Sequence, residues 1–205
     1  ADPGPLSIVS SGAISANLPI HLQQSTQFIT TNANITLGSV NSYAANPLVT
    51  YNLGINAGTG VVTTGDIGTK IPVYDVSIIG AGNFALPNIT TAGGYISIQP
   101  SIVLIAADRS LKTTALGFTG NIIDIGSSVE GPFGLSLDGG SAGDVHFYGA
   151  LGGTTAVSSV NVLNSRDLYV GASWNIGTGG VSFNNLGTLT LGPSGSPILL
   201  TSSGP

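Results

Sequence analysis

A repeating interval between strand openings constrains the fold of this 205-residue chain more than any other feature. Short apolar segments open just after turns of Gly, Ser, Asn or Pro, and 19 to 25 residues separate successive openings. A period of about 22 residues is typical of solenoid coils, whereas the strands of a β-sandwich recur every 8–12 residues or so and need no longer rhythm. The openings lie at Leu6, Gln27, Leu48, Val73, Tyr95, Leu116, Leu135, Val157 and Val181.

The segments within each interval are predicted to be β-strands. They are rich in Val, Ile and Thr, and many alternate apolar and polar residues with period two, as half-buried strands do. A surface helix would need charged helix formers at many positions, but only 6% of the residues are charged. We therefore predict an all-β chain.

Stacked coils also account for the low charge. Each coil of a β-solenoid lies about 4.8 Å from the next, so that like charges would form repelling ladders and Ser, Thr, Asn and Gly are favoured outside. We expect a parallel β-solenoid of eight or nine coils. Residues 1–4 are interpreted as a processed or cloning-derived leader, and residues 5–205 as a single solenoid segment of a longer protein.

Composition excludes several classes of function. Four Lys and Arg residues against nine Asp and Glu cannot neutralise a nucleic-acid backbone, so no nucleic-acid partner is expected. The chain has no Cys, which excludes disulfides and thiolate metal sites. The longest apolar run, residues 102–107, is far shorter than the roughly 18 residues of a membrane helix, so we expect no membrane insertion.

Residues 143–163 read GDVHFYGALGGTTAVSSVNVL. This resembles the repeats of filamentous-haemagglutinin-like surface adhesins of Gram-negative bacteria, which commonly run GDVxFxGxVGGTTPLxSLxV. Similar turn-and-strand patterns flank these residues, so the resemblance extends over about residues 117–192. The matching positions are Gly143, Asp144, Val145, Phe147, Gly149, Gly152, Gly153, Thr154, Thr155, Ser159 and Val162.

The resemblance implies a right-handed parallel β-helix that is secreted through an outer-membrane export partner, displayed at the cell surface and involved in virulence. Its binding partner would be a glycan or protein receptor on a host or neighbouring cell. The Asn-Pro-Asn motifs of the family's secretion domain are absent, with only Asn46-Pro47-Leu48 and Leu86-Pro87-Asn88 coming near. We therefore interpret the segment as shaft or binding surface.

No catalytic, metal or cofactor site is predicted. Stacking could bring two of Asp124, Asp138 and Asp144 to one face, as glycoside hydrolysis requires. The favoured interpretation is that Asp138-Gly139-Gly140 and Gly143-Asp144 are turn residues whose side chains bond their own backbone. Residues 139–145 narrowly miss the calcium-binding nonapeptide. His21 and His146 lie 125 positions apart without nearby ligands, so ordinary strand positions are expected for both.

Aromatic residues are the first candidates for receptor binding. Tyr148, Tyr169 and Trp174 lie within about one coil of each other, and an exposed row of rings would form a platform for a sugar ring or a protein. The alternative, favoured for Phe147 and Trp174, is that these rings fill the core or cover an end of the solenoid.

Two further receptor-binding candidates are segments with unusual composition. Thr63 and Thr64 lie in the Gly- and Thr-rich stretch 56–69, which we expect to be a loop whose residues 57–68 are dispensable for folding. Arg109 and Lys112 bring positive charge to a chain that has little. Adjacent Arg166 and Asp167 are expected to pair with neighbouring coils, because strand neighbours point to opposite faces.

The leading hypothesis is a non-enzymatic adhesin segment. A polysaccharide-active β-helix enzyme or phage tailspike would require more charged residues on one face than the chain offers. A structural filament or ice-binding solenoid would need Thr-x-Thr ranks repeated from coil to coil, whereas Thr here occurs mostly as doublets such as Thr154-Thr155.

Overall fold

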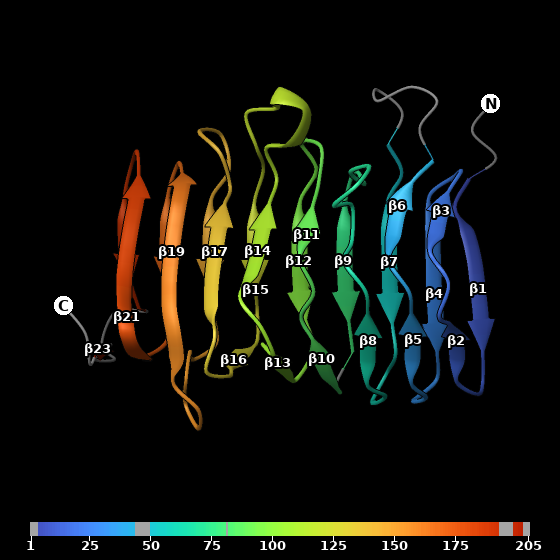
Figure 1. Cartoon of the computed structure of the whole chain (residues 1–205), viewed down its shortest axis with the longest axis horizontal. Coiled ribbons are helices and arrows are strands. Elements are labelled where there is room, and N and C mark those ends of the chain that lie inside the picture. The colour runs from blue at the N-terminus through green and yellow to red at the C-terminus, as the bar shows by residue number, and fades with distance from the viewer. Residues whose placement is uncertain (1–3, 44–49, 81, 193–198, 203–205) are drawn as a thin grey trace.

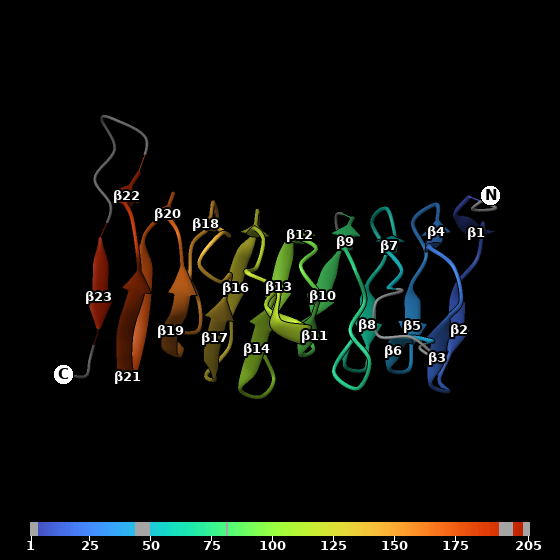
Figure 2. The same cartoon turned by 90° about the horizontal axis from the view of Figure 1, so that it is seen from above.

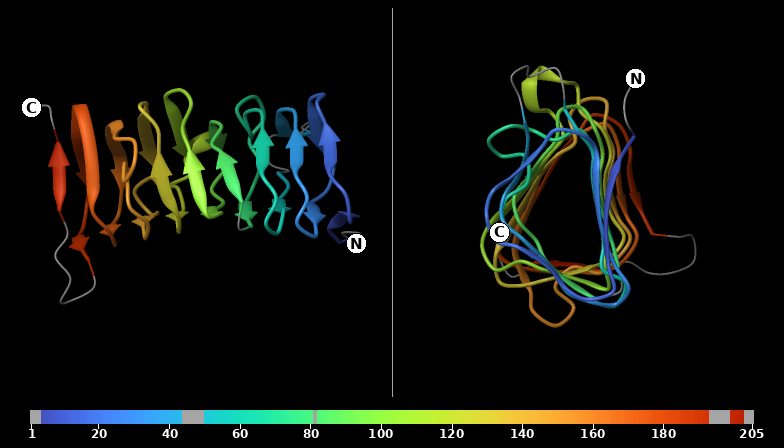
Figure 3. Two further views of the ribbon diagram at one scale, coloured as in Figure 1. Left: turned by 90° about the horizontal axis from the view of Figure 1, so that it is seen from below. Right: turned by 90° about the vertical axis from the view of Figure 1, so that its right-hand side faces the viewer.

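The structure is a computed structural model that describes residues 4–43, 50–80, 82–192 and 199–202. It is a β-solenoid of about eight turns, as predicted, extended along one axis (Figure 1). Viewed along that axis, the coils superpose as a three-sided outline (Figure 3). All strand pairs among the described residues are parallel, and an isolated Ala92–Thr114 bridge is antiparallel.

The largest wall is a nine-stranded sheet, here called the first sheet. Its strands follow one another along the solenoid axis in chain order (Figure 2). They are β1 (Leu6–Ser10), β4 (Thr26–Thr30), β7 (Leu53–Asn56), β9 (Val76–Ile79), β12 (Ile96–Gln99), β15 (Ile123–Ile125), β18 (Val145–Phe147), β20 (Leu168–Val170) and β22 (Leu189–Leu191).

Two six-stranded sheets and a two-stranded sheet form the other walls. The second sheet holds β2 (Ile14–Ala16), β5 (Ile35–Leu37), β8 (Val62–Thr64), β10 (Asn83–Ala85), β13 (Ile102–Leu104) and β16 (Ser128–Glu130). The third holds β11 (Ile89–Thr90), β14 (Arg109–Lys112), β17 (Gly134–Asp138), β19 (Val157–Ser165), β21 (Trp174–Asn185) and β23 (Leu200–Ser202). The pair is β3 (Ile20–Leu22) with β6 (Val40–Ser42), and a 3-10 turn spans Ala115–Gly117.

Successive coils differ in length because their corners differ. In the first sheet the inward row Leu6, Thr26, Leu53, Val76, Ile96, Ile123, Val145, Leu168 and Leu189 is stacked in register, with 20 to 27 residues between neighbours. The predicted period was therefore correct.

The predicted phase was wrong in the second half of the chain. Leu135, Val157 and Val181 open or lie within strands of the third sheet, and Leu116 lies in the 3-10 turn. Leu48 falls outside the described residues. Each coil contributes a strand to several walls, so turn-and-strand patterns recur more than once per coil. The strand openings predicted from the sequence therefore follow the first sheet early in the chain and the third sheet later.

The core is a set of aliphatic ladders inside the three walls. Alternate residues of each strand point inward, and Ile78, Ile98 and Ile125 form one such fully buried row. Phe147 and Trp174 add a ring contact with centroids 4.9 Å apart and planes at 77°. This packing makes each wall a rigid support for the side chains on its outer face.

Candidate functional site: an aromatic patch on the first sheet

Three ring side chains gather on the outer face of the first sheet, and we call His146, Tyr148 and Tyr169 the aromatic patch. His146 stands in register with Asp124 on the preceding strand and with Tyr169 on the following one. Since side chains alternate across a strand, Tyr148 emerges on the same face two residues after His146. The patch is therefore formed by β18, by Tyr148 directly after it and by β20.

The rings of the patch contact one another edge to face or at a tilt. The ring centroids of Tyr148 and Tyr169 are 5.3 Å apart. The ring centroid of His146 lies 5.8 Å from that of Tyr148 and 6.0 Å from that of Tyr169. The Tyr148 hydroxyl and His146 Nδ1 are 3.3 Å apart. The Tyr148 residue is 49% exposed, while His146 and Tyr169 are half-buried. These mutual contacts hold the rings without burying them.

A shallow hollow of about 430 Å³ adjoins the rings. Its remaining wall is polar, so that a ligand in it would meet rings on one side and hydroxyl and carboxylate oxygens on the other. The polar lining residues are Asp144, Asp167, Thr188 and Thr190, and Leu168 also lines the hollow.

An ion pair between adjacent coils borders this hollow. Arg166 donates two hydrogen bonds to the Asp144 carboxylate, from Nε at 2.9 Å and from Nη2 at 2.5 Å. These bonds and the charge of Asp144 raise the pKa of the Arg166 guanidinium. Arg166 Nε also lies 3.5 Å from Asp167 Oδ2, which corrects the expectation that these neighbours do not pair. The expected partner on the adjacent coil is confirmed in Asp144.

Burial perturbs two acidic groups at the patch. It raises the pKa of the Asp124 carboxyl, and the nearby His146 charge lowers that pKa by a smaller amount. Burial, followed by the charges of Asp124 and Tyr169, raises the pKa of the Tyr148 hydroxyl. Tyr148 is therefore a neutral hydroxyl at physiological pH, able to donate as well as accept a hydrogen bond.

Most carboxylates outside the patch support corners between coils. Asp66, Asp75, Asp108, Glu130, Asp144 and Asp167 each accept a backbone N–H from the following coil. Asp138 accepts the Thr114 hydroxyl at 2.7 Å, and Asp124 accepts the Gln99 amide at 3.4 Å. In the described part of the chain, every carboxylate thus has a structural hydrogen bond.

Among the described residues, no group of three or more His, Asp and Glu side chains could hold a metal ion. Within the same ranges, no helix is long and apolar enough to cross a membrane. Asp144 lies in the stretch 139–145 that resembles the calcium-binding nonapeptide. Its carboxylate accepts hydrogen bonds from the Arg166 side chain and from the Asp167 backbone N–H.

Trp174 does not join the patch. Its residue is 1% exposed and its ring packs between Phe147 and Phe183, with centroids 4.9 and 5.7 Å away. The predicted receptor contact at Trp174 is therefore wrong, because a buried ring cannot meet a receptor, and the core alternative is confirmed for it and for Phe147.

The charged candidates do not form a common surface. Arg109 pairs in register with buried Leu135 on the next strand and is itself half-buried. Its Nε is buried and forms no hydrogen bond among the described residues. Lys112 is exposed and lies opposite Asp138. The two cations thus occupy different sides of β14.

The Gly- and Thr-rich stretch 57–68 is part of the solenoid wall. It contains β8, and Ala57, Val62 and Ile67 are buried in the core. The expectation of a dispensable loop is wrong, since its removal would take a strand out of the second sheet. Thr63 is exposed on β8, whereas the hydroxyl of Thr64 is buried without a partner.

Sequence reasoning did not identify His146 as a patch residue and predicted only an ordinary strand position for it. A signal was available, because His146 and Tyr148 share one face and Tyr169 follows His146 by 23 residues, about one coil.

No protein-family model matches the chain, and no solved structure matches it. The chain is 29% identical over 188 residues to a protein named Adhesin BmaC autotransporter, from Brucella suis biovar 1 (strain 1330). The aligned region covers 88% of this chain and 5% of that protein, so the chain spans a small part of the relative's length.

Proposed function

We propose that this chain is a non-enzymatic segment of a bacterial cell-surface adhesin, which attaches to a glycan or protein receptor on a host or neighbouring cell through the aromatic patch. The observation that carries the proposal is the convergence of His146, Tyr148 and Tyr169 on the outer face of a rigid sheet. The similarity to part of an adhesin supports it.

Rings held in this way suit recognition without catalysis. Tyrosine presents a large apolar surface together with a polar tip, which fits both the C–H face of a sugar and the side chains of a protein. The corner hydrogen bonds of the carboxylates further favour a binding role, because paired catalytic acids would need to be free to exchange protons.

Export and display are part of the proposal. The haemagglutinin-like repeat pattern at residues 143–163 supports a secreted or surface-displayed protein. Passage of the full-length protein through a separate outer-membrane partner, and a role in virulence, stay predictions from that resemblance.

The ice-binding alternative lacks a suitable surface on the second sheet. The row that contains Thr36 and Thr63 continues through Ala85 and Leu104 to Glu130, so threonine is not repeated from coil to coil. We therefore do not favour it.

Attachment of the purified chain to receptor-bearing cells tests the proposal. Tyr148→Ala combined with Tyr169→Ala should reduce attachment at least about tenfold, while the far-ultraviolet circular dichroism stays that of the parent. Tyr43→Ala is the matched control, since Tyr43 is 55% exposed and lies beyond β6, away from the patch. Undiminished attachment of the double variant would overturn the proposal.

Salt gives an independent test. The chain carries a net charge of −5 with few cations, so attachment through rings and hydroxyls should change little as ionic strength rises. A steep loss of attachment with salt would indicate a charge-driven contact and contradict the aromatic patch.

A further inference from the structure

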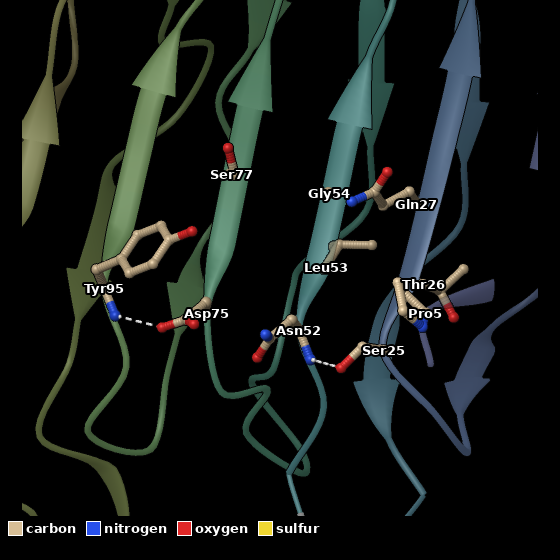
Figure 4. Close-up of a pocket in the computed structure, with 10 residues that line it drawn as sticks. All are labelled: Pro5, Ser25, Thr26, Gln27, Asn52, Leu53, Gly54, Asp75, Ser77 and Tyr95. Atoms are coloured by element: carbon tan, nitrogen blue, oxygen red, sulfur yellow. Dashed lines mark hydrogen bonds between the residues drawn. The ribbon is translucent and has the colours of Figure 1, made fainter. Parts of the chain in front are cut away.

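A second hollow lies on the first sheet towards its N-terminal end. It has a volume of about 340 Å³ and extends over β4, β7 and β9 to the start of β12 (Figure 4). We call it the glycine groove, because Gly54 forms its floor. Its lining residues are Pro5, Ser25, Thr26, Gln27, Asn52, Leu53, Gly54, Asp75, Ser77 and Tyr95.

The groove exists because a glycine interrupts an outward row of side chains. Gln27, Gly54, Ser77 and Ser97 stand in register on successive strands. A Cβ placed on Gly54 would lie 3.1 Å from Cγ of Gln27, so even a methyl group would crowd the floor. Figure 4 shows the Gln27 side chain on one side of this gap and the Tyr95 ring on the other.

The polar groups around the groove are available to a ligand. The side chains of Gln27, Asn52 and Ser77 form no hydrogen bond to another residue of the described ranges. Asp75 uses Oδ1 to accept the Tyr95 N–H at 2.9 Å, which leaves Oδ2 without a protein donor among those residues. The Tyr95 hydroxyl likewise has no protein partner there.

The groove continues along the strands. An adjoining hollow of about 220 Å³ shares Gln27, Gly54, Ser77 and Tyr95, and it extends past Ile29, Asn56 and Ile79. The combined space is therefore longer than a single binding pocket, with polar groups at one end and two aliphatic side chains at the other.

These groups match a neutral sugar. Amides, a hydroxyl and a carboxylate oxygen can bond the hydroxyls of a pyranose, and an aromatic ring beside them can pack on its C–H face. None of the four Lys and Arg residues lines either hollow, so a sulfated or sialylated sugar would meet Asp75 without a compensating cation. An apolar ligand would leave the polar groups unsatisfied.

We propose that the glycine groove binds an uncharged oligosaccharide, with the Tyr95 ring against one sugar and Gln27, Asn52 and Asp75 bonding its hydroxyls. The groove is distinct from the aromatic patch, and its binding does not depend on the patch being the attachment site.

An array of neutral hexose oligosaccharides, with sialylated and sulfated counterparts, identifies probes for the whole chain. Titration calorimetry with the neutral probes that bind then measures affinity. We expect binding to neutral probes and little to acidic ones. Gly54→Asn should fill the floor, and Tyr95→Ala should remove the ring, each weakening affinity at least about tenfold. Circular dichroism and the melting temperature establish that each variant is folded before its affinity is compared.

Two further variants keep the test decisive. Gln27→Ala removes an exposed side chain without hydrogen bonds among the described residues, so it should weaken binding without disturbing the fold even if Gly54→Asn fails to fold. Tyr148→Ala, in the aromatic patch, should bind neutral probes as the parent does. The proposal is overturned if no neutral probe binds, if Tyr95→Ala and Gln27→Ala both retain parental affinity, or if Tyr148→Ala alone abolishes binding.

Discussion

Phe147 and Tyr148 are consecutive in the chain and lie on opposite sides of the same wall of the solenoid. Phe147 is 0% exposed and packs on Trp174, whereas Tyr148 is 49% exposed and contacts the rings of His146 and Tyr169 on the outside. One strand thus supplies both the core and the proposed binding surface, and the two roles can be separated by mutation.

Phe147→Ala should lower the free energy of unfolding by about 3–5 kcal/mol, because it leaves a cavity in a packed core. Tyr148→Ala should lower it by only about 0.5–1.5 kcal/mol, because it removes ring contacts at the surface and leaves no cavity in the core. Urea denaturation followed by circular dichroism measures both. Equal effects of the two variants would contradict the assignment of inner and outer faces.

The stability of the chain should depend on the protonation of Asp124. Burial raises the pKa of this carboxyl in the folded protein, so the folded state binds the proton more tightly than the unfolded state does. Its favourable contribution is then present below the unfolded pKa of about 3.9 and is lost as pH rises through the higher folded pKa.

Asp124→Asn should therefore stabilise the protein at neutral pH. The gain should be below about 1 kcal/mol, since solvent screens a half-buried group, and it should shrink below about pH 4. Melting temperatures of parent and variant across pH measure this. A variant that is less stable than the parent at pH 7 would show that the carboxylate is favourably held.

The ion pair between Arg166 and Asp144 should contribute to stability in a salt-dependent way. Arg166→Gln should lower the melting temperature slightly at low salt, with a smaller effect near 1 M salt, because ions screen an exposed pair. Lys112→Gln is the control, since Lys112 is exposed and has no ion pair among the described residues.

A double variant with Asp144→Asn tests whether the two residues act together. If they do, Arg166→Gln should lower the melting temperature less in the Asp144→Asn background than in the parent. Additive losses would mean that each side chain acts alone.

Gly140 should be intolerant of a side chain. Its φ is +77°, and a Cβ there would lie 2.1 Å from the carbonyl oxygen of Thr119 on the preceding coil. Gly140→Ala should cost at least about 2 kcal/mol, because backbone strain and a steric clash add.

Gly117→Ala separates these two causes. Gly117 has a φ of +81°, but nothing lies within 4 Å of its added Cβ, so only strain of about 1–2 kcal/mol is expected. Thermal denaturation of both variants gives the comparison, and an equal loss in each would show that the contact with Thr119 relaxes freely.

The strands and the period of the solenoid follow from the order of residues along the chain. Residues 143–163 alternate in a way that predicts strands, and a turn around Gly140 was expected from turn chemistry. The turn lies over residues 140–142, whereas Asp138, which was expected in it, is the last residue of β17. The period was also predictable, because every coil has to travel around the same core before it can pair with its neighbour. Local residue types and their spacing are enough to specify these features.

The phase of the coils and the position of the binding surface depend on contacts between coils. Each coil places strands on several walls and its corners vary in length. Residue order alone therefore does not say that His146 stacks on Tyr169 or that 57–68 contains a strand of the second sheet. The same holds for Gly54, whose missing side chain forms a groove only because Gln27 and Ser77 stand beside it in register. Register between coils decides which side chains meet. Strand pairing joins residues 19 to 27 positions apart, and corners of variable length set that separation.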